Sequence, residues 1–550
     1  MIRPALLRLA ASLAALLAST AHADTLIDNV DGFTLDRAGK VERLSGLVIS
    51  ADGRVAQVLQ RGDKRPARVD YLLDGKGRVL MPGLVDGHAH VMKIGFAALT
   101  LDLSAATSLG DVQARVTAYA AAHPDRPWIL GRGWNPAAVG TTNAAGIDAA
   151  VGDRPVWLES ADGHQGWANT AALTAAGVTA ATRDVPGGRI ERVAGKPTGL
   201  LSEAAMDLVT RVVPPPRPED RDTALAEAQE ALLRRGVTAV TDMGTTIEDW
   251  QAYRRAGDAG TLRVRIMAYA ADTDAMSLIA GPGPSPWLYD DRLRLGGVAL
   301  RADGALATRG ALLKAPYADA PTTGGLAQLG ETQLRNLMSR AGIDRFQVAL
   351  EAHGDRAVAQ GIAAFAELGQ TYTGDRRWRM DTAQVVDPAD IPALKTGGLI
   401  MVMTPATLAP AIAEQRLGVD RAVRVQPWAS LVRAGVPLAF GSGATGAEQL
   451  GPWASLAVAS TRQDAAGQPY GGWQAQERID LAAALAAWTT GAAQAAFADG
   501  HFGRLEVGQR ADFLLVDRDP LLASPSELRE TRVLETWVGG RKVWAAEGGH

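Results

Sequence analysis

The sequence predicts an α/β protein whose centre is a (β/α)8 TIM-like barrel, and three observations support this. Eight short apolar segments alternate with helix-like stretches across the middle of the chain, the pattern of parallel strands joined by crossover helices. The first two segments are much farther apart than one crossover needs, which predicts an inserted subdomain at roughly residues 101–218. Both ends of the chain instead have the sequence pattern of short strands joined by turns.

The first residues predict export. Arg3 and Arg8 give a positive start, Leu9–Leu17 is a short apolar run, and Ala21-His22-Ala23 is a small-x-small cleavage site. We therefore expect residues 1–23 to be a cleaved signal peptide and the mature chain to be periplasmic or secreted. An uncleaved anchor is the alternative, but the apolar run is shorter than the ~20 residues of a membrane-spanning helix.

Composition narrows the possible partners. There is no cysteine, which excludes disulfides, thiolate metal ligands and a cysteine nucleophile. The formal net charge is -4 at pH 7 and no basic tract appears, so nothing indicates a nucleic-acid partner. No later segment is long and uncharged enough to span a membrane in the mature chain. We expect a small-molecule substrate, and a homodimer stays open as an assembly.

The two ends of the chain contain recognisable strand pairs. Leu47–Ser50 and Val55–Val58 flank an Asp52-Gly53 turn, which predicts a hairpin. At the other end, residues 503–517 read as strand, turn and strand, and residues 533–544 as a further strand pair. Periodicity alone establishes only that both ends are rich in β-structure.

The eight barrel strands are expected in the middle of the chain. Their ranges are 79–85, 237–242, 262–270, 293–300, 346–350, 378–382, 399–403 and 437–440. A helical stretch over residues 219–235 precedes the second strand. Barrels of this kind carry their chemistry at the C-terminal ends of the strands, so the residues after each range are the candidates for a site.

His88 and His90 follow the first of these strands. Alternate side chains share one face of a strand, so both imidazoles would project together from its C-terminal end. Two neutral imidazoles at that place can hold a divalent metal. A pair of histidines in a turn is the simpler alternative.

The segment that contains these histidines, Leu80–His90, resembles the opening of the metal-dependent amidohydrolases. The most similar branch is amidohydrolase family 3, which includes N-substituted formamide deformylases. The resemblance implies a composite β-sandwich of residues 24–80 and 503–550 and a barrel of residues 81–502. It also implies hydrolysis of a non-peptide carbon–nitrogen bond, amide or formamide, in a small molecule. A divalent metal, zinc or manganese, would be the cofactor, and a metal-free site is the alternative.

Further motifs similar to that family assign other site residues. They lie at residues 128–134, 163–173 and 302–312, and the second is the most distinctive. By this resemblance His164 faces the substrate cavity, and Asp303 and Arg309 lie at its edge. The implied catalytic residues are Asp303 and His164, and the implied substrate contacts are Arg309, His353 and Trp134.

Four positions depart from the family pattern. Ala299, Glu351, Thr382 and Gly443 stand where the family has metal-binding or proton-transferring residues. Metal-assisted hydrolysis needs a cation to activate water and a base to take its proton, and Gly443 can supply neither. An unpaired buried Glu351 would be costly, so we expect it to bind a cation, pair with an arginine or become protonated.

These departures leave three hypotheses open. In a working hydrolase with a rebuilt metal site, the ligands would be His88, His90, Glu351 and, as a weaker fourth, Asp381. In the second hypothesis the chain is a catalytically impaired pseudoenzyme that binds a small molecule. In the third, a metal-free hydrolase uses His164, Asp303 or Glu351 as acid and base.

Overall fold

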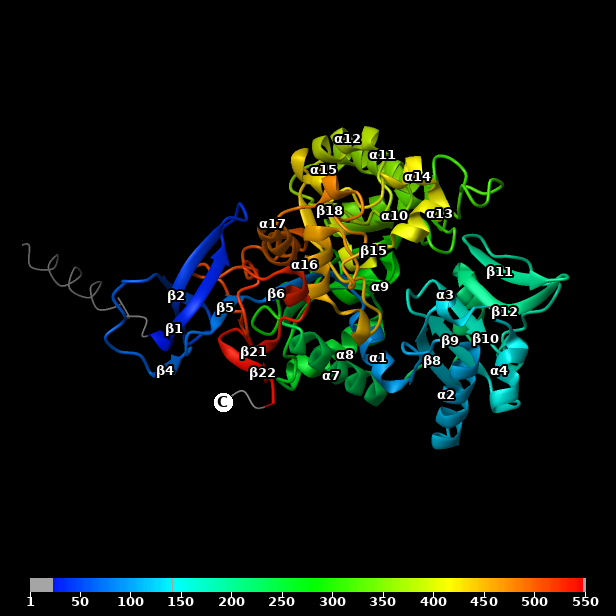
Figure 1. Ribbon diagram of the computed structural model, residues 1–550, viewed down its shortest axis with the longest axis horizontal. Helices are drawn as coiled ribbons and strands as arrows, with labels where there is room; N and C mark the ends of the chain where they lie inside the picture. The colour runs from blue at the N-terminus through cyan, green and yellow to red at the C-terminus, as the bar shows by residue number, and fades with distance from the viewer. Residues whose placement is uncertain (1–22, 141, 548–550) are drawn as a thin grey trace, which may run out of the picture.

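The structure is a computed structural model that describes residues 23–140 and 142–547, and its centre is an eight-stranded parallel sheet (Figure 1). The sheet follows chain order, and a parallel bridge between Ala89 and Ala444 joins its two edges. The strands are β6 (Leu84–Ala89), β13 (Val237–Thr245), β14 (Arg265–Ala270), β15 (Leu293–Arg301), β16 (Gln347–Ala352), β17 (Arg379–Thr382), β18 (Ile400–Met403) and β19 (Leu438–Phe440). The predicted (β/α)8 barrel is therefore confirmed.

The first expected strand, residues 79–85, is divided between two sheets. β5 (Val79–Pro82) pairs antiparallel with β20 (Phe513–Val516), whereas β6 enters the barrel beside β13. Gly83 separates the two strands, and a Cβ at this position would lie 2.3 Å from Thr238 Oγ1 on β13. The chain can change sheets here because glycine leaves no side chain between the two backbones.

Helices cover the outside of the barrel, and α7 (Pro218–Arg234) shows how the sequence specifies one. Pro218 stands in the first turn, where its missing N–H leaves no hydrogen bond unmade. Leu225, Leu232 and their neighbours are buried at three- and four-residue spacing, so one face packs on the sheet. The chain turns at Gly236, which has a φ of 83°.

The other helices after barrel strands follow the same order along the chain. They are α1 (Val91–Leu99), α8 (Ile247–Asp258), α9 (Thr273–Ala280), α10 (Glu331–Ile343), α11 (Asp355–Thr371), α12 (Ile391–Thr396), α13 (Pro410–Leu417), α14 (Val419–Ala422), α15 (Trp428–Arg433), α16 (Pro452–Thr461), α17 (Leu481–Ala486) and α18 (Ala492–Ala495). Together with the strands they enclose the main apolar core of the protein.

A β-sandwich built from both ends of the chain forms one end of the molecule, at the left in Figure 1. Its sheets have the orders β3-β2-β1-β4 and β22-β21-β20-β5. Their remaining strands are β1 (Ala23–Leu35), β2 (Val41–Ser50), β3 (Val55–Leu59), β4 (Tyr71–Asp74), β21 (Val533–Val538) and β22 (Arg541–Ala545), with helix α19 (Pro525–Arg529) between β20 and β21. Leu47, Leu80, Phe513 and Trp537 share one buried cluster, which confirms the expected composite sandwich.

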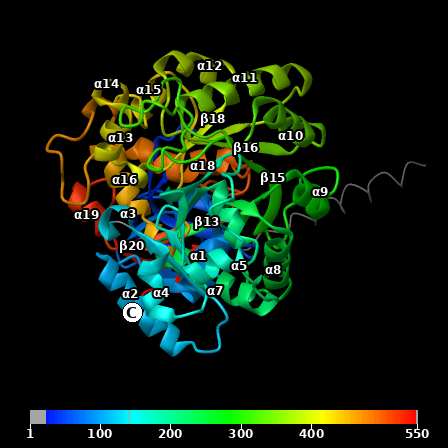
Figure 2. The same ribbon diagram turned by 90° about the vertical axis from the view of Figure 1, so that its right-hand side faces the viewer.

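The inserted subdomain lies at the opposite end of the molecule, and Figure 2 shows it in front of the barrel. Its sheet has the order β11-β12-β10-β9-β8-β7. The strands are β7 (Leu101–Asp102), β8 (Ile129–Trp134), β9 (Val156–Ser160), β10 (Gln165–Ala168), β11 (Gly188–Val193) and β12 (Lys196–Glu203), and the helices are α2 (Leu109–Ala122), α3 (Pro136–Val139), α4 (Ala144–Val151), α5 (Thr170–Ala175) and α6 (Asp207–Thr210). A separate apolar core, which includes Ile129 and Trp167, stabilises this subdomain.

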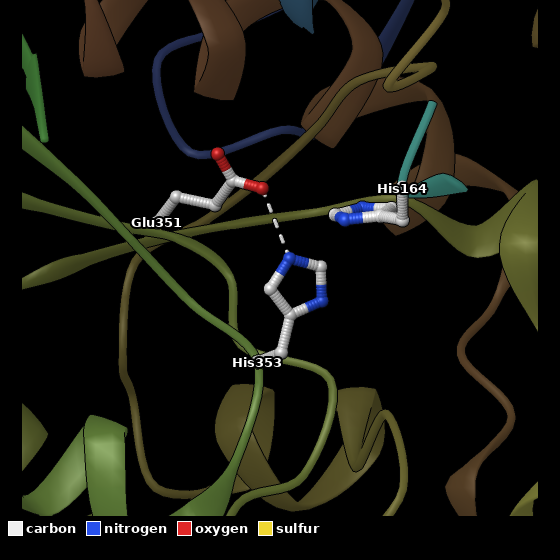
Figure 3. Close-up of side chains that lie close together, drawn as sticks. All are labelled: His164, Glu351 and His353. Carbon is white, nitrogen blue, oxygen red and sulfur yellow. Dashed lines mark hydrogen bonds and ion pairs between the residues drawn. The ribbon is translucent and has the colours of Figure 1, made fainter. Parts of the chain in front are cut away.

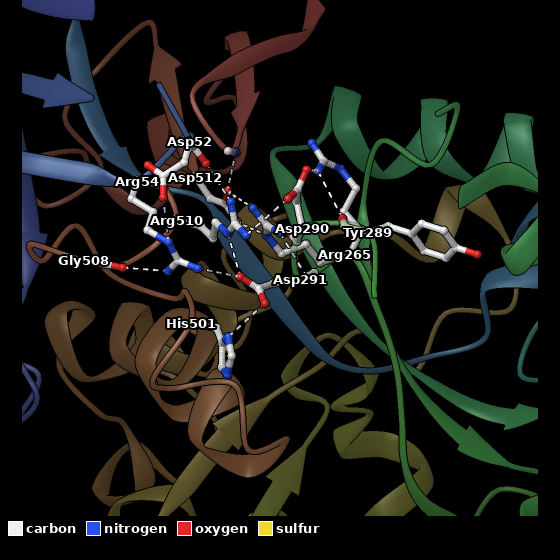
Figure 4. Close-up of polar contacts among 12 residues, drawn as sticks. Asp52, Arg54, Arg265, Tyr289, Asp290, Asp291, His501, Gly508, Arg510 and Asp512 are labelled. Carbon is white, nitrogen blue, oxygen red and sulfur yellow. Dashed lines mark hydrogen bonds and ion pairs between the residues drawn. The ribbon is translucent and has the colours of Figure 1, made fainter. Parts of the chain in front are cut away.

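Buried ion pairs join the sandwich to the N-terminal end of the barrel (Figure 4). Arg265, the first residue of β14, donates to both carboxylate oxygens of Asp512 at 2.6 and 2.8 Å. Arg510 donates to Asp291 at 2.6 Å, and His501 Nδ1 lies 3.2 Å from the other oxygen of Asp291. Burial opposes the charge of Asp291, but His501 and Arg510 hold its pKa below the ordinary value. These ion pairs therefore keep the buried side chains of the junction charged. They lie at the end of the barrel opposite the C-terminal ends of its strands.

Two expectations concern targeting. In the part of the chain that the structure describes, no helix is long and apolar enough to cross a membrane. The expected signal peptide falls on residues 1–22, outside the described residues, and on Ala23 at their border. Export therefore stays a prediction from the sequence.

Candidate active site

Three side chains converge at the C-terminal end of the barrel (Figure 3). His164 comes from the loop between β9 and β10 of the inserted subdomain, Glu351 from the end of β16, and His353 from the residue after that strand. One ligand atom from each lies within 4.8 Å of the others. His353 Nε2 is 2.9 Å from Glu351 Oε1, and the rings of His164 and His353 lie 5.4 Å apart and nearly perpendicular. The cluster thus spans two parts of the fold.

Glu203 fixes His164, and the sequence analysis missed this residue. Its Oε2 lies 3.0 Å from His164 Nδ1, while its Oε1 accepts hydrogen bonds from Thr308 Oγ1 at 2.7 Å and from the Ala305 N–H at 3.1 Å. Burial opposes both charges, but their attraction and hydrogen bonds outweigh it, so the pKa of Glu203 falls to about 2 and the pKa of His164 rises to about 9. The backbone φ of 56° at Glu203 is unusual for a residue with a side chain.

Arg301 fixes Glu351 in a similar way. Arg301 Nε donates to Glu351 Oε2 at 3.0 Å, and His353 binds the other carboxylate oxygen. Burial alone would raise the pKa of Glu351, but Arg301 and His353 hold it well below the ordinary value. Of the three outcomes expected for a buried Glu351, the structure shows pairing with an arginine.

Asp303 fixes the backbone of His353. Its Oδ1 accepts a hydrogen bond from the His353 N–H at 2.7 Å, and its Oδ2 accepts from the N–H groups of Leu312 and Gly354 at 2.7 and 2.8 Å. Burial raises the pKa of this carboxyl group to about 6, although these hydrogen bonds favour the charged form. Asp303 is fully buried, and these three contacts make it a residue that positions His353; its expected catalytic role stays a prediction.

His88 and His90 project together from the end of β6, as the sequence predicts, with their rings 5.5 Å apart. His88 Nδ1 lies 2.7 Å from Asp381 Oδ2, and His90 Nδ1 lies 2.7 Å from the Met243 carbonyl oxygen. A carbonyl only accepts hydrogen bonds, so His90 carries its proton on Nδ1 and keeps a lone pair on Nε2. Burial and the nearby Lys93 lower the pKa of His90 well below its ordinary value, which favours the neutral form.

Asp381 is not placed to bind a metal, which corrects another expectation. Arg379 Nε donates to Asp381 Oδ1 at 2.7 Å and Arg379 Nη2 donates to Oδ2 at 2.6 Å, while Oδ2 also contacts His88. Both Arg379 and Asp381 are almost completely buried. Asp381 therefore orients His88. Of the four expected ligands, only Glu351 belongs to the three-residue cluster found among the described residues.

Two expected substrate contacts lie elsewhere. Trp134 is completely buried in the core of the inserted subdomain, where its Nε1 donates to the Leu158 carbonyl at 3.0 Å. This position contradicts a role in substrate binding, because no surface of the side chain is open. Arg309 forms an ion pair with Asp319 at 2.8 Å in the loop after β15. Because Asp319 already neutralises the guanidinium group, Arg309 has no free charge to offer a substrate.

Two of the substituted positions, Ala299 and Gly443, carry no side chain that could bind a metal. The Gly443 N–H donates to the His88 carbonyl at 2.8 Å, and its φ of 66° disfavours any residue with a side chain. Ala299 packs beside Met243 and Tyr269 inside the barrel. The chemistry that the family places on strands β15 and β19 is therefore absent from these two positions.

The His164–Glu351–His353 cluster has the donor atoms that a divalent metal needs. Two histidines and one glutamate form a three-ligand set known from catalytic zinc sites, which leave a position open for water or substrate. The contact of His164 Nδ1 with Glu203 is the carboxylate–histidine arrangement that orients a metal ligand through its other nitrogen. Because the pKa of His164 is raised, metal binding must release its proton. On this chemistry the residues fit a metal.

Comparisons with known proteins identify the family to which the chain is similar. A family model described as the amidohydrolase family matches residues 72–544. Protein LONG AFTER FAR-RED 3 of Arabidopsis thaliana is 32% identical over 492 residues, covering 85% of this chain and 83% of that protein. N-substituted formamide deformylase of Arthrobacter pascens is 26% identical over 549 residues, covering 94% of this chain and 97% of that protein.

A solved structure shows the same fold. An uncharacterized metal-dependent hydrolase from Pyrococcus horikoshii OT3 superposes with a TM-score of 0.73 at 23% identity, covering 91% of this chain and 99% of that chain. The family model spans most of the chain and agrees with the resemblance of Leu80–His90. The chain belongs to the amidohydrolase family, in its family 3 branch.

Proposed function

We propose that the protein is an exported hydrolase that cleaves a non-peptide carbon–nitrogen bond, amide or formamide, in a small molecule. The family supports hydrolysis, and a relative named as a formamide deformylase supports the type of bond. The catalytically impaired alternative finds no support, because a complete donor cluster stands at the mouth of the barrel.

The observation that carries this proposal is the convergence of His164, Glu351 and His353. Each of the three has its own hydrogen-bond partner, respectively Glu203, Arg301 and Asp303. Side chains held in this way keep their geometry before a substrate arrives, which is what catalytic positioning requires. A divalent cation held by them would polarise the carbonyl of an amide and lower the pKa of a bound water.

Zinc is the metal that the donor set favours. Two imidazoles and one carboxylate suit zinc, whereas sites built from oxygen ligands suit magnesium or manganese. Manganese is the second candidate, because the carboxylate of Glu351 supplies an oxygen ligand, and oxygen ligands suit manganese. Elemental analysis of protein purified without chelator distinguishes the two metals.

One experiment tests the function. We would compare the parent with His164→Ala, Glu351→Ala and the control His123→Ala, whose ring packs on Tyr119 in the inserted subdomain. The proposal expects one equivalent of metal and hydrolysis of N-substituted formamides or acetamides in the parent and the control. Both properties should be lost in the other two variants. A metal-free parent that hydrolyses no amide would contradict the proposal.

Export has a separate test. The residues that motivate it are Arg3, Arg8 and the apolar run before Ala23. N-terminal sequencing of protein recovered from intact cells should begin at Asp24. A product that begins at Met1 and stays in the cytoplasm would refute export and leave the assignment of the site untouched.

A further inference from the structure

In the described part of the chain, the inserted subdomain and the barrel share no apolar cluster. The two apolar clusters of the subdomain, around Ile129 and around Trp157, contain only residues from the range 101–209. The clusters of the barrel contain no described residue of that range. Relative motion is the ordinary expectation for two parts of a protein that are joined without a common apolar interface.

Glu203 makes three of the polar contacts that join the two parts. It ends β12 of the subdomain, and its carboxylate reaches the barrel loop that follows β15. There Oε1 accepts hydrogen bonds from Thr308 Oγ1 at 2.7 Å and from the Ala305 N–H at 3.1 Å, and Oε2 accepts from Gln328 Nε2 at 3.3 Å. Further hydrogen bonds across the boundary join Arg132 to Thr445, Arg189 to the Thr308 carbonyl and Gln449 to the Ala161 carbonyl. Polar contacts of this kind can be exchanged for contacts with water at a modest net cost.

The barrel loop provides a socket for the Glu203 carboxylate. A Cβ at Gly304 would lie 2.4 Å from Glu203 Cδ, and a Cβ at Gly310 would lie 2.7 Å from Glu203 Oε1, so glycine leaves the room that the carboxylate needs. The backbone of Glu203 is strained, with a φ of 56° and a ψ of -134°, a region that residues with a side chain rarely adopt. Contacts in the socket maintain this conformation, and the strain is relieved if the carboxylate leaves. Strain of this kind is typical of switch regions.

We infer that the inserted subdomain is a lid that opens and closes over the barrel mouth, that Glu203 is its latch, and that a bound metal holds the lid closed. This inference rests on the proposed function, because it uses the His164–Glu351–His353 cluster. His164 belongs to the lid, whereas Glu351 and His353 belong to the barrel, so the three donor atoms meet only in the closed arrangement. A ligand that binds one arrangement better than the other shifts the population toward it. Glu203 couples latch and cluster, because its Oε2 also lies 3.0 Å from His164 Nδ1.

Two short chain segments connect the lid to the barrel. Thr100 lies between α1 and β7, and residues 211–217 lie between α6 and α7. Residues at the ends of elements are the ones that absorb the backbone rotation of a hinge. An open lid admits a substrate to the barrel mouth, and closing the lid brings His164 back to the cluster and excludes water.

The test measures the separation of lid and barrel directly, which is practical because the sequence contains no cysteine. Spin labels are attached at Ala121→Cys in α2 of the lid and at Ala366→Cys in α11 of the barrel, two exposed positions, and the distance between them is measured by pulsed electron paramagnetic resonance. With zinc we expect a single distance in the labelled parent. After zinc is removed with a chelator, a second distance should appear, which comes from the open lid.

Thr308→Val removes one hydrogen bond of the latch and leaves the metal-binding cluster intact. Without zinc, the ratio of open to closed lid should rise about tenfold over the parent, since a hydrogen bond to a charged group contributes about that much. Zinc should return this variant to the single closed distance. The matched control is Thr174→Val in α5 of the lid, whose hydroxyl donates to the Thr170 carbonyl of the same helix, and it should behave as the parent does.

The distance measurement separates this inference from the proposed function. If zinc closes the lid but no amide is hydrolysed, the proposed function fails and the lid stands. If amides are hydrolysed, yet neither the parent nor Thr308→Val shows a second distance without zinc, the lid is refuted. A second distance that zinc leaves unchanged would also overturn the inference, because closure would then be independent of the metal. His353→Ala removes a ligand on the barrel side, and zinc should no longer close the lid in this variant.

Discussion

Removing the guanidinium group of Arg379 gives the sharpest test of how the barrel interior is held together. Arg379 and Asp381 lie two residues apart on β17, joined by two hydrogen bonds of 2.6 and 2.7 Å, and both side chains are almost completely buried. In Arg379→Met the carboxylate of Asp381 keeps only His88 as a side-chain partner. Leaving one charge of a buried pair behind destabilises a protein by about 3–5 kcal/mol, and we expect a loss of this size.

The pH dependence gives the sign of the effect. Burial opposes the charge of Asp381, but Arg379 and His88 hold its pKa below the ordinary value, so its stabilising contribution in the parent is present above about pH 4 and is lost as pH falls further. Without Arg379, less favourable charge interaction offsets the effect of burial, so the pKa of Asp381 rises. The variant therefore gains stability when Asp381 becomes protonated, and the difference from the parent should shrink between pH 7 and pH 4.

The assay is urea denaturation followed by tryptophan fluorescence at several pH values, with Arg379→Lys as a control that keeps the charge. The double variant Arg379→Met/Asp381→Leu supplies a second control, because an apolar pair of similar volume removes the buried charge. It should recover most of the stability but not the orientation of His88. A loss below about 1 kcal/mol in Arg379→Met, or a loss independent of pH, would refute this reasoning.

Three further predictions follow from other contacts. In Glu203→Gln the pKa of His164 should fall from about 9 toward its ordinary value near 6.5, as measured by NMR titration of the ring. The difference in free energy of unfolding between parent and variant should be largest between about pH 4.5 and 6.5, and it should disappear as pH rises through about 9. Arg265→Met leaves Asp512 without its ion-pair partner at the sandwich junction and should cost about 3–5 kcal/mol, seen as a lower thermal midpoint and faster proteolysis of the C-terminal strands. Trp134→Phe removes one hydrogen bond, which contributes about 1 kcal/mol, so the thermal midpoint should fall by the corresponding amount and KM should not change. A raised KM would instead show that Trp134 contacts the substrate.

The sequence predicts the barrel well, because each strand is a short apolar run followed by a helical stretch. It does not predict the division at Gly83, since β5 and β6 are both apolar and the decisive contact is with Thr238, far along the chain. Periodicity reports which residues are buried but not the sheet that buries them. The hydrophobic pattern therefore predicts the eight strands, but it does not predict the boundary between the sandwich and the barrel.

The site was only partly predictable for the same reason. Glu203 ends β12 and meets His164 and Thr308 only in the folded protein, so no local pattern marks it. Arg379, in contrast, could have been found: it lies two residues before Asp381, and residues two apart share a strand face. Polar residues at the ends of predicted strands indicate where a site forms. Whether a carboxylate there binds a metal or positions another residue depends on which neighbours form hydrogen bonds with its oxygen atoms, and the sequence does not show this.

The pairing of β5 with β20 has a consequence for how the chain is made. More than 400 residues separate these strands in the sequence, so the second sheet of the sandwich has no complete ladder until the ribosome has added β20, β21 and β22. Contacts of such long sequence separation form late and slowly. A chain that terminates early, or that is cut before β20, keeps Leu80 and its apolar neighbours uncovered, and such surfaces direct a protein toward aggregation and degradation. The first strands of the sandwich are therefore covered only in a chain that has been synthesised through β20.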